Sequence, residues 1–291
     1  MRRREAVELA IVGTGKAGSA LGRMFWKAGV STVLISREHR KASRPRIVRA
    51  QDEDCPREVS YVLLAVPDSV ISEAAQRMLD VRVIGPASLV GHLSGFEPSA
   101  ILSPPIARSR VFSAHPLAEF PGAVTSGGAA ERFAGIEAPS RTVERRVKRL
   151  FERIGFHSFR LDPAKKPLYH TAAVMAANMP HALLAASARW FRIAEVPDPL
   201  SASRKLMLDA QVNATAADRA TGLSGPFRRG DARTIAGHIE AIRTHDPRFL
   251  EMYVAVGRVL LDLVRPIAEP ERNPWPTIEQ ILNSANPPSD P

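Results

Sequence analysis

The first half of the chain alternates short apolar runs with segments of helical periodicity. The run at 59–66 is almost continuously apolar, which is typical of a central parallel strand buried on both faces. The segment from Ser140 to Ile154 instead places its apolar side chains on one side of a helix, with Ser140 as N-cap. Repeated units of this kind predict an α/β domain with a doubly wound parallel sheet. The predicted strands are 7–12, 32–36, 59–66, 88–93, 111–114, 132–138 and 159–161, and the other predicted helices are 17–28 and 69–78, the latter capped by Ser69.

The pattern changes at Asp162 and Pro163, after which long helical stretches replace the alternation. Pro180 is expected to kink the first of them, because proline lacks the backbone N–H that a helix uses. A proline-rich tail begins at Pro266, with at most a short helix at 278–282 and mobile last residues. The expected helical stretches are 164–194, 200–221, 232–245 and 247–264, and the predicted parts are an α/β domain at 1–162, an all-helical domain at 163–266 and a tail at 267–291.

The turn between the first predicted strand and helix carries the most specific motif. Its sequence is Gly13-Thr14-Gly15-Lys16-Ala17-Gly18, the G-x-G-x-x-G spacing that binds a dinucleotide when a strand precedes it and a helix follows. Gly13 allows the tight turn, Gly15 leaves room for the pyrophosphate, and Gly18 lets the helix pack close to the strand. The pyrophosphate then meets the free N–H groups of the helix. The motif predicts a Rossmann domain, and a glycine-rich turn in another α/β fold is the alternative.

The second predicted strand ends where the ribose of such a cofactor is recognised. An acidic residue about 20 residues beyond the glycines normally holds the ribose 2′-hydroxyl. This chain has Arg37 there, preceded by Ser36, and both side chains suit a 2′-phosphate. Arg40 and Lys41 either contact the same phosphate or belong to a solvated basic face. We therefore expect NADP(H) in preference to NAD(H).

Composition narrows the classes of function. The formal charge is +10, but the basic residues are scattered and aromatic residues make up only 6%, so nucleic acid is not an expected partner. The excess charge suits an anionic cofactor and a small anionic substrate. No apolar run has transmembrane length and no secretory leader is expected. The single cysteine, Cys55, fits the reducing cytoplasm and leaves no disulfide framework or cysteine metal cluster.

Three stretches carry a family resemblance: 112–117 (FSAHPL), 166–174 (KPLYHTAAV) with Asn178, and 224–231 (SGPFRRGD) continuing to Thr234 and His238. With the glycine motif, they resemble proteins that join a Rossmann-like domain to a DUF2520 domain, in the 6-phosphogluconate-dehydrogenase-like superfamily. Ser224 stands where threonine is usual in that group and retains the hydroxyl. The resemblance implies an oxidoreductase related to ketopantoate reductase, to pyrroline-5-carboxylate reductase and to F420-dependent NADP oxidoreductases. It also implies catalysis between the two domains and a homodimer formed through the helical domain.

Candidate site residues of the first domain lie at strand ends, because the carboxyl edge of a parallel sheet faces the cofactor. The resemblance implies that Ala65, Val66 and Pro67 lie along the cofactor and that His92 and Ser94 lie near the nicotinamide. Asp68 either contacts the cofactor or caps the next helix. His115, in a loop after its strand, and Ser94 are expected to contact the substrate.

The first helix of the second domain carries the catalytic candidates. Lys166 and His170 are four residues apart and share a helix face, and Asn178 lies two turns beyond. Related reductases use a Lys-x-x-x-Asn pair, in which lysine is the acid and asparagine orients the substrate. His170 takes the asparagine position here, so the resemblance implies that Lys166 or His170 gives the proton or orients the carbonyl, with Asn178 as a further catalytic candidate near the same face. Reduction of a ketone or imine needs such a proton donor opposite the hydride. The alternative is that Lys166 is a solvated helix-start residue and His170 a structural histidine.

A second group follows a Gly-Pro turn. Arg229 is positioned to bind a substrate carboxylate, and Asp231 is expected to cap the helix that carries Thr234 and His238. Ser224, Arg229, Asp231 and His238 are therefore candidate substrate contacts, although Arg229 and Asp231 alternatively pair to fix their loop. No group of residues has metal-ligand spacing.

Together these residues predict an NADPH-dependent reductase of a small oxo acid, with ketopantoate as the first trial substrate. Reduction of a cyclic imine such as pyrroline-5-carboxylate is the alternative within enzymes. A non-catalytic NADPH-binding sensor or assembly protein is the alternative from another class. The sequence does not choose among substrates.

Overall fold

The computed structural model describes residues 6–37, 45–120, 131–214, 222–267 and 274–285. It divides the chain into two compact units, Met1–Ala177 and Asn178–Pro291. Helix α4 (Lys166–Ala177) belongs to the first unit by this division, whereas the sequence places a boundary after residue 162.

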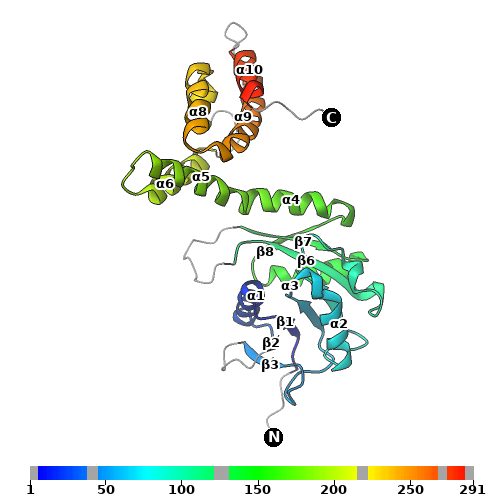
Figure 1. The fold of residues 1–291 in the computed structure, drawn as a ribbon. Coiled ribbons are helices and arrows are strands. Elements are labelled where there is room, and N and C mark those ends of the chain that lie inside the picture. Colours follow the sequence, from blue (N-terminus) through cyan, green and yellow to red (C-terminus); the bar gives the residue numbers. More distant parts are fainter. Residues whose placement is uncertain (1–5, 38–44, 121–130, 215–221, 268–273, 286–291) are drawn as a thin grey trace. The chain divides into compact units, whose positions relative to one another are not determined.

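The first unit is built on an eight-stranded sheet with the order β3-β2-β1-β4-β5-β6-β7-β8. Reversal of the strand order on either side of β1 is the mark of a doubly wound Rossmann topology, so the predicted fold class is confirmed (Figure 1). The strands are β1 (Leu9–Val12), β2 (Thr32–Ser36), β3 (Arg46–Arg49), β4 (Tyr61–Leu64), β5 (Leu89–His92), β6 (Val111–Leu117), β7 (Arg132–Glu137) and β8 (Phe156–Arg160).

One pair of strands departs from the parallel arrangement. β6 and β7 are antiparallel, whereas every other neighbouring pair runs parallel. The two strands follow one another in the chain, and antiparallel neighbours need no crossover helix between them. The sheet is therefore mainly parallel, with one reversal near the edge that β8 closes.

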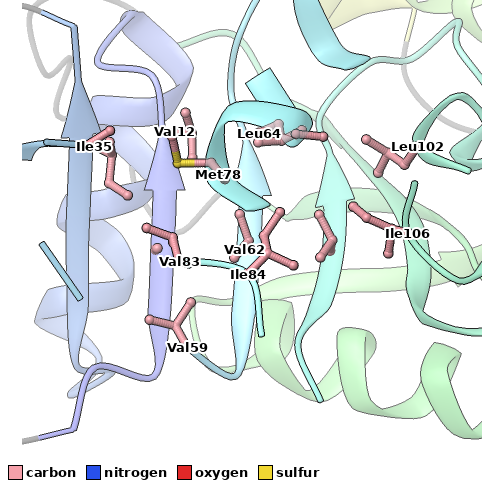
Figure 2. Packing of buried hydrophobic residues seen from close by; sticks show 14 of the residues in the cluster. Val12, Ile35, Val59, Val62, Leu64, Met78, Val83, Ile84, Leu102 and Ile106 are labelled. Carbon is pink, nitrogen blue, oxygen red and sulfur yellow. The ribbon is translucent and has the colours of Figure 1, made fainter. Parts of the chain in front are cut away.

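Helices cover both faces of the sheet. Alternate residues of β1 enter two different cores, with Val12 on the face covered by α2 (Ile71–Asp80) and Ile11 on the other. Figure 2 shows the first core, in which Met78 of α2 packs over the strands. α1 (Lys16–Lys27) and α3 (Arg141–Glu152) bury their apolar sides in the second core. Two-sided burial explains why these strands read as continuous apolar runs.

Two serines predicted as N-caps differ in the structure. The hydroxyl of Ser140 accepts a hydrogen bond from Val143 N at 3.3 Å, so the cap of α3 is confirmed. The prediction for Ser69 is wrong, because Asp68–Val70 forms a 3-10 turn and α2 begins only at Ile71. Ser69 therefore lies inside the turn, where its hydroxyl is not the cap of the helix.

The position of His115 corrects a second expectation. His115 and Pro116 lie within β6, opposite Gly135 and Ala134 of β7, and not in a loop after the strand. β6 is paired with β5 only as far as Ser113, so its last residues have a partner strand on one side. A proline is tolerated there, because the side of the strand without a partner requires no backbone N–H for a hydrogen bond. Antiparallel pairing thereby holds the His115 backbone in a regular strand.

The second unit is helical. Its core gathers residues from four helices, among them Phe227, Ile239, Val254 and Ile278. The helices are α5 (Met179–Ile193), α6 (Pro199–Asn213), α7 (Pro226–Arg229), α8 (Ala232–His245), α9 (Leu250–Val264) and α10 (Trp275–Ala285).

Several helix boundaries differ from the predicted ones. Pro180 lies in the first turn of α5, where a missing N–H costs nothing, so it starts a new helix and does not kink a continuous one. α10 is longer than the predicted 278–282, because Trp275, Ile278 and Leu282 bury one side of it. The predicted 200–221 helix ends at Asn213, and its remainder at 215–221 lies outside the described residues. Within the described parts of the chain, no helix has the length and apolarity needed to cross a bilayer.

Candidate cofactor and substrate sites

The glycine turn after β1 is packed too tightly for side chains at two positions. Gly13 has φ = 111°, and a Cβ there would lie 2.2 Å from the Ala65 carbonyl oxygen. A Cβ on Gly18 would lie 2.2 Å from the carbonyl oxygen of Gly13. These clashes show why the motif needs glycine at its first and last positions.

Gly15 differs from both, because a Cβ there would meet no protein atom within 4 Å. It is the N-cap residue of α1, and no side chain caps this end of the helix. Unsatisfied N–H groups and the positive end of the helix dipole therefore border open space. A diphosphate fits this arrangement, with Thr14, Lys16 and Ala17 of the motif beside it.

A cavity of about 290 Å³ adjoins this turn and brings most of the predicted cofactor residues together. Ser36 and Arg37 line it from the end of β2, and the Ser36 hydroxyl lies 3.3 Å from Thr14 Oγ1. Ala65, Val66 and Pro67 line it after β4. Arg40 and Lys41 lie outside the described residues. The cavity has the lining that an adenosine ribose with a 2′-phosphate requires.

The structure adds a wall to this cavity that the sequence motif did not include. Glu73, Ala74 and Arg77 of α2 line it together with Val70. Arg77 is exposed and is the second guanidinium at the cavity beside Arg37. The sequence contains the basic residue in the last turn of a predicted helix, but only the fold shows that this helix faces the end of β2.

Asp68 and Ser94 meet at the carboxyl edge of the sheet. Ser94 Oγ donates to Asp68 Oδ2 at 2.7 Å and accepts from the N–H groups of Phe96 and Glu97. Asp68 therefore does not cap α2. It anchors the segment from Ser94 to Ser99, called the 94–99 loop below.

His92 holds the same loop from beneath. Its side chain is completely buried, its Nδ1 accepts from Ser94 N at 3.2 Å, and its Nε2 lies 3.2 Å from the Pro98 carbonyl oxygen. Burial, helped by the charge of Lys166, lowers the pKa of His92 to about 4. His92 is therefore neutral at pH 7, with Nε2–H donating to Pro98, and both of its ring nitrogens are engaged.

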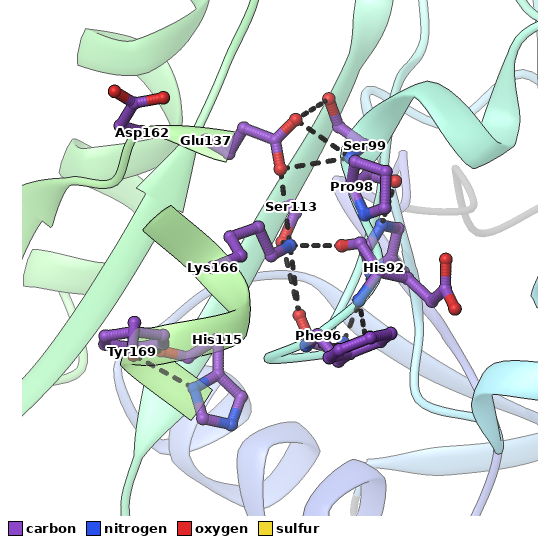
Figure 3. A network of polar contacts seen from close by, with 12 residues as sticks. His92, Phe96, Pro98, Ser99, Ser113, His115, Glu137, Asp162, Lys166 and Tyr169 are labelled. Carbon is purple, nitrogen blue, oxygen red and sulfur yellow. Dashed lines mark hydrogen bonds and ion pairs between the residues drawn. The ribbon is translucent and has the colours of Figure 1, made fainter. Parts of the chain in front are cut away.

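Lys166 is buried under the loop and is 0% exposed. Its Nζ donates to Ser113 Oγ at 2.7 Å and to the Ser94 carbonyl at 3.3 Å, and it also contacts the Glu97 carbonyl (Figure 3). Glu137 Oε2 lies 3.3 Å from the same nitrogen. An ammonium has three hydrogens to donate, so four acceptors leave none for a ligand.

Glu137, on β7, completes this network and was missed by the sequence interpretation. Its carboxylate accepts from Ser99 N at 2.9 Å and from Ser99 Oγ at 2.7 Å. Burial lowers the pKa of Lys166, and the Glu137 carboxylate opposes that change. Removal of one partner of a buried ion pair strongly destabilises the folded protein, because the other charge is left without compensation. Lys166 and Glu137 thus clamp both ends of the 94–99 loop.

His115 and His170 lie beside Gly95 in this loop. Their rings pack edge to face with centroids 5.6 Å apart. A Cβ on Gly95 would lie 2.5 Å from His170 Nδ1 and 2.9 Å from His115 Nε2. Tyr169 OH lies 2.9 Å from His115 Nδ1. The glycine therefore lets two imidazoles approach the loop that also carries Ser94.

The candidates of the second unit are not gathered in this way. Asp231 caps α8 by accepting from Thr234 N at 3.0 Å and Thr234 Oγ1 at 2.7 Å, which confirms its predicted capping role. His238 Nδ1 lies 2.9 Å from Tyr253 OH. The side chains of Asn178, Ser224, Arg229 and His238 are exposed. Among the described residues, no cluster of three or more metal-ligating side chains is placed to hold a metal ion.

Comparison with known families finds two domain models, and the second begins about 30 residues before the expected boundary at 162. The Rossmann-like domain model matches residues 2–121. The model of DUF2520, a domain of unknown function, matches residues 132–259. No curated protein matches the sequence significantly.

Solved structures share the fold at low sequence identity. A Thermotoga maritima protein is 23% identical, with a TM-score of 0.70 over 89% of this chain and 99% of its own. A candidate NADP oxidoreductase of Bacteroides fragilis is 17% identical, with a TM-score of 0.71 over 88% of this chain and 98% of its own. Plasmodium falciparum pyrroline carboxylate reductase, solved with NADP bound, is 10% identical, with a TM-score of 0.61 over 89% and 98%.

Proposed function

This chain carries a Rossmann-like domain followed by a DUF2520 domain, and from that premise we propose that it is an NADPH-dependent reductase. The cofactor would lie with its diphosphate at Gly13, Gly15 and Gly18 and its 2′-phosphate at Arg37. The observation that carries the proposal is the open, uncapped helix start at Gly15 beside a cavity lined by Arg37. When bound, the reduced nicotinamide supplies a hydride.

The proposed substrate is a small oxo acid, with ketopantoate as the first compound to try. A cyclic imine such as pyrroline-5-carboxylate is the second candidate, favoured by the fold shared with a pyrroline carboxylate reductase. Contacts of Asn178, Ser224, Arg229, Asp231 and His238 with the substrate stay predictions, as do the location between the domains and the cytoplasmic setting.

In the first unit, the contacts support a substrate-binding role for some candidates and a structural role for Lys166. Ser94 and His115 are proposed to contact the substrate, and His170 lies beside them. The proton-donor role of Lys166 stays a prediction. Its ammonium is buried and surrounded by acceptors of the chain, which favours a structural role. It would hold the 94–99 loop and supply a fixed positive charge beneath it.

Two measurements test the proposed function. Fluorescence titration should show NADPH binding more tightly than NADH. A screen of oxo acids and cyclic imines should then identify a compound that consumes NADPH, measured by its absorbance. Binding of NADPH without turnover of any compound would favour the sensor alternative, and equal affinity for both cofactors would contradict the role of Arg37.

A further inference from the structure

His115 has one ring nitrogen that is bonded and one that is available. Its Nδ1 lies 2.9 Å from Tyr169 OH, whereas no described group bonds its Nε2. Tyr169 OH is also 3.4 Å from the His115 carbonyl oxygen, which is long for a hydroxyl hydrogen bond. The shorter contact favours donation of the hydroxyl proton to Nδ1, which would give His115 the tautomer that carries its hydrogen on Nε2.

The surroundings favour the neutral form of this ring. Burial, with the neighbouring His170 and Lys166, lowers the pKa of His115 to about 4, and Asp68 opposes the change weakly. Burial also raises the pKa of Tyr169 to about 12. At pH 7, His115 and Tyr169 are both neutral, and each has one proton to donate.

Two of the other candidate donors near the loop are committed elsewhere. Both nitrogens of His92 are engaged with Ser94 and Pro98, and the hydrogens of Lys166 are taken by buried acceptors. His170 Nδ1 is buried without a partner. Of the two imidazoles beside Gly95, His115 is the one with a hydroxyl on its other ring nitrogen, from which a proton can be replaced.

We propose that Tyr169 and His115 form a proton relay for the reduction, with His115 Nε2–H donating to the substrate atom that becomes a hydroxyl or amine. This inference rests on the proposed function. As hydride adds to the carbonyl carbon, the C–O π electrons move to oxygen, which accepts the Nε2 proton. Nδ1 takes the Tyr169 hydroxyl proton, and solvent restores Tyr169. An alkoxide is a far stronger base than a tyrosinate, so the transfer is downhill.

The first test needs no turnover. Nitrogen NMR of selectively labelled histidine should show His115 as the neutral Nε2–H tautomer at pH 7, remaining neutral to about pH 5. Tyr169→Phe removes the partner of Nδ1 and should populate the other tautomer. A His115 that is protonated at pH 7, or that carries its hydrogen on Nδ1 in the unaltered chain, would overturn the relay.

The second test uses the substrate found by the screen. Loss of a proton donor costs about 10²–10⁴ in rate, so His115→Ala should reduce kcat by that factor with NADPH affinity unchanged, and Tyr169→Phe by tenfold or more. Leu168→Ala, on the same helix and 76% exposed, is the matched control and should be unaffected.

The outcomes separate the two proposals. Turnover that survives His115→Ala with less than a tenfold loss refutes the relay and leaves the reductase standing. Failure of the unaltered chain to reduce any compound refutes the reductase and the relay with it, whereas the NMR result still reports the tautomer.

Discussion

At the scale of single residues, position in the fold decides what a charged side chain can do. Arg37 and Arg77 are exposed at an open cavity, where Arg37 is proposed to bind the cofactor. Lys166 is equally basic by sequence, but its ammonium is enclosed by acceptors of the chain itself. Residue type alone therefore did not separate a ligand-binding cation from one that holds a loop.

Arg37→Ala should weaken NADPH binding and leave NADH binding unchanged, because only NADPH carries the 2′-phosphate. A charged hydrogen bond is worth about 1.5–3 kcal/mol, roughly tenfold to a hundredfold in Kd.

Arg77→Ala should weaken the binding of both cofactors alike, since Arg77 faces the cavity from the α2 wall, where it can stack on adenine. Fluorescence titration measures both, with Arg145→Ala on α3 as a control for lost charge. Equal losses of NADPH and NADH in Arg37→Ala would be incompatible with this assignment.

His92 should make the protein less stable in mild acid. Its pKa falls from 6.5 to about 4 on folding, so between these values the unfolded chain binds more protons than the native one. Stability is therefore complete above pH 6.5 and is lost as pH falls toward 4, by on the order of 3 kcal/mol. Urea unfolding from pH 7 to pH 4.5 measures this slope. His92→Asn retains an acceptor for Ser94 N without titrating, and its slope should be shallower. Parallel slopes would show that His92 titrates normally in the native state.

At the scale of elements, hydrogen bonds at helix ends decide where each helix begins. Ser140 and Ser69 both precede helices, yet only Ser140 accepts a bond from a helix N–H. Pro67 leads into a 3-10 turn, which delays the start of α2 beyond Ser69. A serine before a helix therefore stabilises the helix at position 140 but not at position 69.

Ser140→Ala should lower the free energy of unfolding by about 1 kcal/mol, the usual worth of an N-cap. Ser69→Ala is the matched control and should change it by less than about 0.5 kcal/mol, as for an ordinary surface substitution. Urea denaturation at pH 7 measures both. A larger loss at Ser69 than at Ser140 would mean that the helix starts are assigned incorrectly.

At the scale of the whole molecule, the helical unit exposes apolar surface that its own core does not cover. In α6 only Ser203 is buried, whereas Leu206 is 58% and Val212 68% exposed. Further exposed apolar residues lie on α5 and α9, including Met179, Leu183 and Val259. Large exposed apolar patches mark association surfaces, so these residues are where the predicted second copy of the chain would bind.

The protein should therefore be a homodimer by light scattering at micromolar concentration. Leu206→Glu places a charge on the exposed face of α6 and should shift the population to monomer. Thr142→Glu adds the same charge to α3 in the first unit and should leave the dimer intact. A monomeric unaltered protein would refute the prediction.

Sequence alone was sufficient for features that depend on local pattern. The glycine turn, the strand at 32–36 and the helix at 232–245 could be predicted because apolar periodicity, N-caps and tight turns act between residues close in the chain. The structure has β2 at Thr32–Ser36 and α8 at Ala232–His245. The DUF2520 domain was expected from a resemblance to a known group, and family models match both it and the Rossmann-like domain.

Only the tertiary structure decided which side chains meet. Glu137 and Lys166 are 29 residues apart, and His115 and Tyr169 are 54 apart. No periodicity connects such positions, because their contact depends on how β6, β7 and α4 pack around the 94–99 loop. Burial there removes water from Lys166 and His115, which lowers the pKa of both. The sequence determined which residue types are present. Long-range packing decided their protonation and which of their atoms have no hydrogen-bond partner within the chain.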